Sequence, residues 1–100
     1  MDIDTAQIHQ PIRIDAAHPS LPGHFPGRPV VPGVVLLDQV AAALERAGAG
    51  RFARIGVVKF SAPLLPEQDS QLVATRVGAK VCFRIERDGR SILSGDGELI

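Results

Sequence analysis

The chain has 100 residues, 45% of them apolar and 22% charged, and its 11 basic side chains balance 11 acidic ones. This length supports one core, so residues 1–100 are expected to form a single domain, and the charge balance argues against nucleic-acid binding, which depends on a basic face. The sequence holds no apolar run of membrane-spanning length and no readable secretory leader, so we expect a cytoplasmic protein without a membrane partner.

A short strand is predicted at about Ile8 to Ile14, although Pro11 interrupts it. The following stretch, from His18 to Gly33, holds five prolines and three glycines. Because each proline fixes φ and removes a backbone donor, this stretch forms neither a long helix nor a central strand. It is also too apolar for a flexible linker. The pattern therefore predicts a rigid, partly buried loop, and loops of this length in small domains are usually functional.

A helix is predicted from Val34 to Ala47, between Pro32–Gly33 and the glycines that begin at Gly48. Proline suits the first helical turn, and glycine suits the position just past a helix end. The first turn, Val34 to Leu37, is apolar on every side, so we expect it to be buried all round. The polar positions of the helix share one arc, which on periodicity alone faces solvent: Asp38, Gln39, Glu45 and Arg46.

The second half of the chain is typical of β-strands, which we predict at Phe52 to Ser61, Gln71 to Val77, Lys80 to Glu86 and Ser91 to Ile100. Val81, Phe83 and Ile85 alternate onto one face of the third of these strands. Asp88 and Gly89 supply the turn of a tight hairpin between the last two. The predicted fold class is α+β, with one helix lying on four or five mostly antiparallel strands.

Three weaker signals were tested and set aside. The glycine pattern from Gly48 to Ala53 matches a dinucleotide fingerprint, but that motif needs a strand before it and a helix after it, and here the order is reversed. The three histidines have no metal-ligand spacing, so no metal site is predicted. Cys82, the lone cysteine, fits a reducing compartment. Its mid-strand position predicts a small core residue rather than a nucleophile.

The strongest signal lies between positions 24 and 38. His24 stands in Gly23-His24-Phe25-Pro26-Gly27-Arg28-Pro29, where prolines stiffen the backbone and can hold an imidazole in one pose for general-base chemistry. Asp38 follows fourteen residues later on the predicted helix. The amides at the helix start, near Gly33 and Val34, lack intrahelical acceptors and lie at the positive end of the dipole. A base, an acid and an oxyanion-stabilising amide are thus encoded close together.

The stretch HPSLPGHFPGRPVVPGVVLLDQV, from His18 to Val40, resembles the signature of the hot-dog-fold 3-hydroxyacyl-[acyl-carrier-protein] dehydratases of fatty-acid synthesis, the FabZ and FabA type, here in a short ApeI-like form. The segment Lys59 to Pro66, KFSAPLLP, resembles the strand and turn that follow the central helix in that family. The resemblance implies one hot-dog domain, an antiparallel sheet wrapped around a single central helix.

The resemblance also implies roles for individual residues. His24 matches the histidine that removes the α-proton of a 3-hydroxyacyl thioester, and Asp38 matches the carboxyl group that protonates the departing β-hydroxyl. Gly33 matches the glycine whose backbone N–H polarises the thioester carbonyl. The substrate-binding residues expected around the helix start are Gly33, Val34, Phe25 and Pro32. No cofactor and no metal are implied.

Two kinds of partner follow from the resemblance: an acyl carrier protein that delivers the substrate, and a second subunit. The family splits its catalytic pair across a two-fold interface, so a homodimer or an oligomer of dimers is expected, with a heterodimer as the alternative.

A hot-dog thioesterase and a non-catalytic acyl-binding partner subunit remain open as other functions. Arg28 is open to two interpretations, a contact with the carrier or its phosphate and, favoured by its loop position, a solvated side chain. The family's glutamine one turn after the acid is replaced by Ala42.

Overall fold

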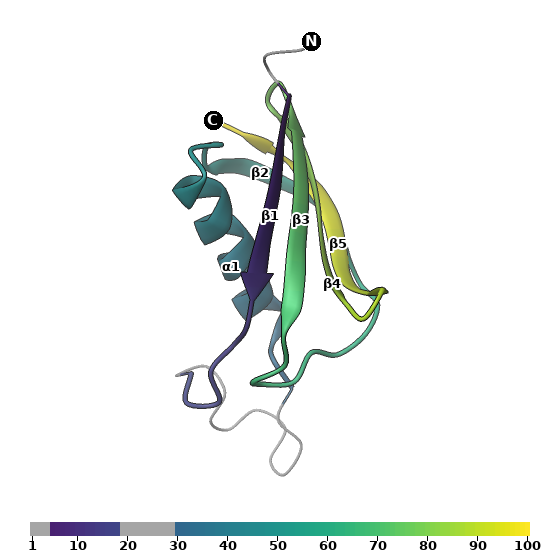
Figure 1. Ribbon diagram of the computed structural model, residues 1–100. Coiled ribbons are helices and arrows are strands. Elements are labelled where there is room, and N and C mark those ends of the chain that lie inside the picture. The colour runs from purple at the N-terminus through teal and green to yellow at the C-terminus, as the bar shows by residue number, and fades with distance from the viewer. Residues whose placement is uncertain (1–4, 19–29) are drawn as a thin grey trace.

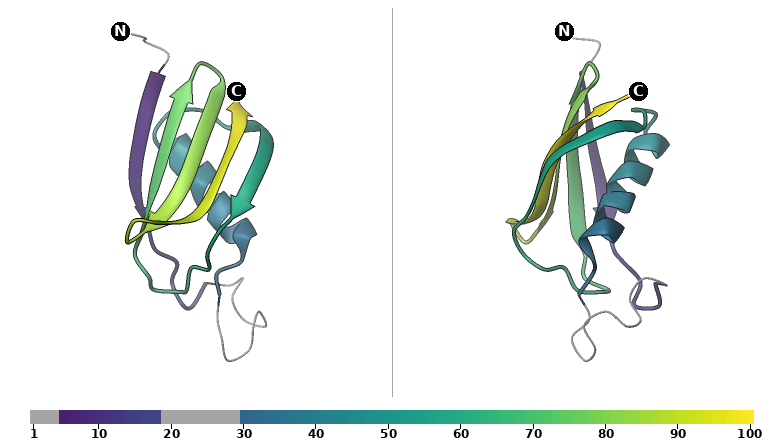
Figure 2. Two further views of the ribbon diagram at one scale, coloured as in Figure 1. Left: turned by 90° about the vertical axis from the view of Figure 1, so that its right-hand side faces the viewer. Right: turned by 180° about the vertical axis from the view of Figure 1, so that it is seen from behind.

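The computed structural model describes residues 5–18 and 30–100, which form one helix and one five-stranded sheet (Figure 1). The helix is α1 (Gly33–Arg46). The strands are β1 (Thr5–Ile12), β2 (Phe52–Phe60), β3 (Ser70–Val77), β4 (Lys80–Arg87) and β5 (Arg90–Leu99). All pairings are antiparallel, and the order across the sheet is β1-β3-β4-β5-β2. The predicted α+β class, with a sheet curved around one helix, is confirmed (Figure 2).

The position of β1 explains how it tolerates a proline. β1 lies at one edge of the sheet and pairs only with β3, where Pro11 stands opposite Gln71. A proline at an edge removes no hydrogen bond that a second neighbouring strand would need. The strand begins at Thr5 and ends at Ile12, so it starts and finishes earlier than the predicted Ile8 to Ile14.

The predicted hairpin between the last two strands is confirmed. β4 and β5 pair from Lys80 opposite Glu98 to Arg87 opposite Arg90. Asp88 and Gly89 form the turn with φ values of 51° and 74°. Positive φ at both central residues gives the turn the twist of the flanking strands, which is why an Asp-Gly pair is favoured here.

The core lies between α1 and the sheet face that it covers (Figure 2). Leu36, Val40 and Leu44 of the helix are buried, as the 3.6-residue period requires. The sheet contributes alternate residues of its central strands, among them Leu72, Ala74, Val81, Phe83, Ile85 and Leu93. Full burial of a Leu, Ile, Val or Phe side chain contributes about 1.5–3 kcal/mol. In the described part of the chain, no helix has the length and apolar character to cross a membrane.

Two burial predictions are wrong. Cys82 is exposed rather than a core residue. Because Val81 and Phe83 face the helix, strand alternation turns Cys82 to the opposite face of the sheet. Val34 is 65% exposed, so the first turn of α1 is not buried all round. The sheet covers only one side of the helix, and no described element of this chain covers the other.

Candidate active site

Helix α1 begins at Gly33 without a side-chain cap, since its N-cap residue is Pro32. The N–H groups of Val35 and Leu36 donate to the Pro32 carbonyl at 3.0 and 3.4 Å. Within residues 5–18 and 30–100, the N–H groups of Gly33 and Val34 have no acceptor. These two donors lie at the positive end of the helix dipole, where they are suited to an oxygen that carries negative charge.

A phenyl ring from the neighbouring edge strand lies against the helix start. A Cβ atom at Gly33 would stand 2.5 Å from Cε1 and 2.6 Å from Cζ of Phe60. A side chain at this position would have to push the ring aside, so glycine permits this close approach. Phe60 is itself 54% exposed, and its ring therefore forms a partly open wall beside the helix start.

The helix start and Phe60 border a pocket of about 460 Å³. Its walls come from the segment before the helix, the first helical turns and the β2–β3 connection. The N–H of Val31 donates to the carbonyl of Leu64 at 2.8 Å and so joins two of these walls. Apart from Ser61, the side chains in the wall are apolar: Val30, Val31, Pro32, Leu36, Phe60, Ala62, Pro63 and Leu64. A pocket of this kind suits an apolar chain.

The predicted site residues fall into three groups. Pro32 and Gly33 line the pocket, whereas Val34 does not and projects from the exposed side of the helix. Asp38 is also exposed, one turn after Val34 on the same side. His24 and Phe25, together with Arg28, lie outside the described residues.

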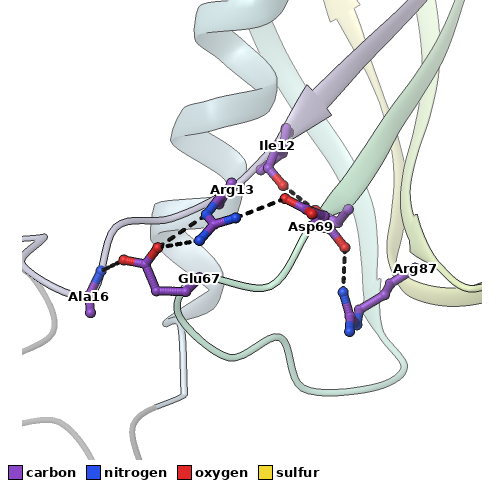
Figure 3. Close-up of polar contacts among 7 residues, drawn as sticks. Ile12, Arg13, Ala16, Glu67, Asp69 and Arg87 are labelled. Carbon is purple, nitrogen blue, oxygen red and sulfur yellow. Dashed lines mark hydrogen bonds and ion pairs between the residues drawn. The ribbon is translucent and has the colours of Figure 1, made fainter.

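A polar cluster joins the segment after β1 to the β2–β3 connection (Figure 3). Oε2 of Glu67 accepts hydrogen bonds from Nε and Nη2 of Arg13 at 3.1 and 2.7 Å, and Oε1 accepts one from the N–H of Ala16 at 2.8 Å. The Ala16 amide, and next to it the Arg13 side chain, hold the pKa of Glu67 below its ordinary value. The hydrogen bond to Glu67, together with its negative charge, raises the pKa of Arg13.

Sequence reasoning assigned no role to Phe60 or Glu67. Phe60 belongs to the KFSAPLLP segment, but its contact with Gly33 depends on how β2 lies beside the helix. Glu67 is 54 residues from Arg13, so no local pattern relates the two. The only available signal for Glu67 is an acidic residue within a turn-rich segment between two strands.

Comparison with known proteins was made on sequence and on structure. The profile of the ApeI-like family, described as ApeI dehydratase, matches residues 1–96. A 3-hydroxyacyl-[acyl-carrier-protein] dehydratase FabZ of Haemophilus influenzae (strain PittEE) is 35% identical over 69 residues, 59% of this chain and 47% of the relative. A FabZ of Rhizorhabdus wittichii is 42% identical over 55 residues, 44% of this chain and 35% of the relative. The chain thus spans about half the length of the first curated relative and 35% of the second.

Two solved structures are similar over nearly the whole chain. One belongs to the dehydratase heterocomplex ApeI:P from Xenorhabdus doucetiae, with a TM-score of 0.80 and 25% identity, covering 99% of this chain and 96% of that one. The other is an uncharacterized protein from Erwinia carotovora subsp. atroseptica, with a TM-score of 0.77 and 28% identity, covering 97% of this chain and 85% of that one. Each similarity covers at least 97% of this chain, so the fold is shared.

Proposed function

Since the chain belongs to the ApeI-like dehydratase family, we propose that it dehydrates a 3-hydroxyacyl thioester, carried on an acyl carrier protein, to the trans-2-enoyl thioester. The observation that carries this proposal is the helix start. Two backbone donors with no acceptor among residues 5–18 and 30–100, at Gly33 and Val34, stand beside an apolar pocket of about 460 Å³ that Gly33 itself lines. An acyl chain in the pocket would bring its thioester carbonyl toward these donors.

In the proposed reaction the imidazole of His24 removes the α-proton of the thioester. Negative charge develops on the carbonyl oxygen, where the Gly33 N–H stabilises it. The carboxyl group of Asp38 then donates a proton to the β-hydroxyl group. The β-carbon–oxygen bond breaks, water leaves, and the electron pair of the α-carbon forms the new double bond. The reaction needs no redox cofactor, because no electrons are gained or lost.

A second subunit completes the site in this proposal. Proton donation by a carboxylic acid near neutral pH needs shielding from water, yet Asp38 is exposed in a single chain. The same side of the helix exposes Val34, and the edge strand β2 exposes Val57 (78%) and Phe60 (54%). Apolar side chains on an edge strand favour pairing with another chain. We take a second copy of this chain as the partner, so the protein should sediment as a dimer at micromolar concentration.

The test is the absorbance of the enoyl thioester when the purified protein is mixed with 3-hydroxyacyl carrier substrates of several chain lengths. The wild-type protein should generate the absorbance, and His24→Ala and Asp38→Asn should each lower the rate by about 10²-fold or more. Glu45→Gln is the matched control, because Glu45 is an exposed acid on the same helix and lies far from Gly33. Flat absorbance from correctly folded wild-type protein would contradict the proposal for the single chain.

A second function, that of a partner subunit without activity alone, is favoured by the similarity to a chain of a dehydratase heterocomplex. Such a subunit would bind acyl carrier substrate but produce enoyl absorbance only after a related dehydratase chain is added. Release of free thiol without enoyl absorbance, measured with a thiol reagent, would instead indicate a thioesterase. The enoyl and thiol measurements together therefore separate all three functions.

A further inference from the structure

The pocket beside the helix start is open to solvent on one side and ends against the hydrophobic core on the other. Three of its wall residues are exposed at the surface: Phe60, Ser61 and Pro63. Three others belong to the core cluster and are at most 4% exposed: Val31, Leu36 and Leu64. A ligand that enters from the exposed side therefore meets tightly packed side chains at the inner end.

The inner end of the pocket is held by the core on two sides. Leu36 lies on the buried face of α1, in line with Val40 and Leu44. Leu64 is joined to the segment before the helix, because its carbonyl accepts a hydrogen bond from the N–H of Val31 at 2.8 Å. Since protein cores are packed as closely as organic crystals, neither leucine can move aside without disturbing its neighbours. The inner end is therefore a fixed wall.

This wall lies close to the backbone donors at the helix start. Gly33 and Leu36 both line the pocket and are three residues apart, which is about 4.5 Å along the helix axis at 1.5 Å per residue. The Cα–Cβ bond of a helical residue tilts toward the N-terminus, which brings the Leu36 side chain nearer to Gly33. The volume of about 460 Å³ is in the lower part of the range for small-molecule sites, about 300–1,000 Å³. The space suits a short or medium acyl chain.

We propose that Leu36 and Leu64 set the maximum length of the acyl chain that this protein accepts, and that this maximum is no longer than decanoyl. The inference rests on the proposed function, which places the thioester carbonyl at the Gly33 N–H, and it adds the length class of the substrate and the residues that determine it. Both leucines would contact the end of the chain and no reacting atom. Because one methylene group in an apolar pocket can change discrimination by about 10–200-fold, a fixed wall gives a sharp limit.

The first measurement is binding, which does not depend on catalysis. Saturated acyl pantetheine thioesters, from butanoyl to dodecanoyl, lack the 3-hydroxyl group and cannot be dehydrated. Titration calorimetry with the full-length protein should show the affinity rising about tenfold for each added pair of methylene groups, as long as both groups enter the pocket. The affinity should stop rising at or before decanoyl, where further methylene groups remain in water.

Two variants should move this limit to longer chains, and a third is their control. Leu36→Ala and Leu64→Ala each remove part of the wall, so the affinity should continue to rise for at least one further pair of methylene groups, by about tenfold. Leu44→Ala is the matched control, because Leu44 is an equally buried leucine on the same helix and does not line the pocket. It should lose stability as Leu36→Ala does but keep the wild-type limit. Affinities are compared per folded molecule, with the folded fraction measured by circular dichroism.

A variant in the opposite direction does not depend on a cavity in the core. Ala62 lines the pocket and is half-buried. Ala62→Leu adds volume to the wall, so the affinity should stop rising at a shorter chain than in the wild-type protein. If Leu36→Ala and Leu64→Ala both fail to fold, this variant decides alone, and an unchanged limit overturns the inference.

The second measurement is the enoyl assay with 3-hydroxyacyl substrates of the same lengths. A chain longer than the pocket displaces its carbonyl from the Gly33 N–H, so kcat/KM should peak at the length where the affinity stops rising and then fall. The peak should move to longer chains in Leu36→Ala and stay in place in Leu44→Ala.

The outcomes separate the inference from the proposed function. The inference is overturned if the wild-type affinity rises through dodecanoyl, if no acyl thioester binds, or if Leu36→Ala and Leu64→Ala keep the limit of Leu44→Ala. In these cases an enoyl signal from the wild-type protein still supports the proposed function. A limit that moves as expected in a protein that forms no enoyl product, alone or with a related subunit, refutes the proposed function and supports the two leucines as the wall of an acyl-binding site.

Discussion

At its C-terminal end, helix α1 is closed by backbone and side-chain contacts that have no counterpart at its start within the described part of the chain. Gly48 adopts a φ of 73°, which lets the N–H of Ala49 donate to the carbonyl of Leu44 at 2.9 Å. Arg76 reaches across from β3, with Nη1 3.4 Å from the carbonyl oxygen of Ala49. At the start, Pro32 offers no side-chain cap, and the amides of Gly33 and Val34 have no acceptor among the described residues.

The exposed side chains also differ between the two ends. Buried apolar residues face the sheet at both ends, but the exposed residues include the apolar Val34 at the start and the charged Glu45 and Arg46 at the end. Backbone donors that have no described acceptor, beside an apolar side chain exposed to solvent, are suited to binding a ligand or a second subunit. The contrast suggests that the C-terminal end stabilises the fold and that the start serves ligand and subunit binding.

The largest expected effect is a loss of stability caused by a substitution near the C-terminal end of α1. Leu44→Ala leaves a cavity in the core and should lower the free energy of unfolding by about 2–5 kcal/mol. Val34→Ala removes an exposed side chain and should change it by about 0.5 kcal/mol or less. Urea denaturation of both variants measures the difference. Similar losses of unfolding free energy in the two variants would show instead that the helix start is covered within the single chain.

Gly33→Ala tests whether the close contact at the helix start matters for activity. The added methyl group would push the half-exposed ring of Phe60 aside, so we expect a loss of about 1 kcal/mol in stability and a loss of enoyl formation. Phe60→Leu, combined with Gly33→Ala, should restore part of the stability. Gly48→Ala is the control at the other end: it forces alanine into a left-handed conformation at a cost of about 1–2 kcal/mol, with activity per folded molecule unchanged.

The smallest expected effect is the pH dependence of the Glu67 contact. Because the folded-state pKa of Glu67 lies below its ordinary value, the stabilisation is present above that ordinary value and is lost as the pH falls through the lowered pKa. Thermal unfolding of the wild-type protein and of Glu67→Gln should therefore differ at pH 7 and converge as the pH falls below the ordinary pKa of a glutamate and through the lowered one. A difference that stays constant with pH would mean that the ionised carboxylate is not responsible.

Much of the fold was predictable because its signals are local. The helix was predicted from Val34 to Ala47 and lies at Gly33–Arg46, since proline and glycine limit it at both ends. The Asp88–Gly89 turn follows from two residues that accept positive φ. The β1 bounds were less accurate, because Pro11 weakens the strand pattern and only pairing with β3 determines where the strand starts and ends.

The exposure of individual side chains was harder to predict from local patterns. Periodicity placed Asp38 on a polar arc, and the structure has it exposed. Val34 was wrongly predicted to be buried, because an apolar side chain on a helix does not reveal whether any other element packs against it. Cys82 was wrongly predicted to lie in the core. The alternation that places Val81 and Phe83 on the buried face was predicted correctly, and it already places Cys82 on the opposite face.

By itself, the sequence determined the order and approximate limits of the helix and strands, the hairpin turn, and a proline-rich segment that resembles a known dehydratase signature. These depend on the preferences of residues within a few positions of one another. Only the tertiary structure decided that Phe60 lies on Gly33 and that Glu67 binds Arg13 and Ala16. Contacts between residues so far apart in the chain depend on strand order, register and the side of the sheet that the helix covers, which no local preference specifies.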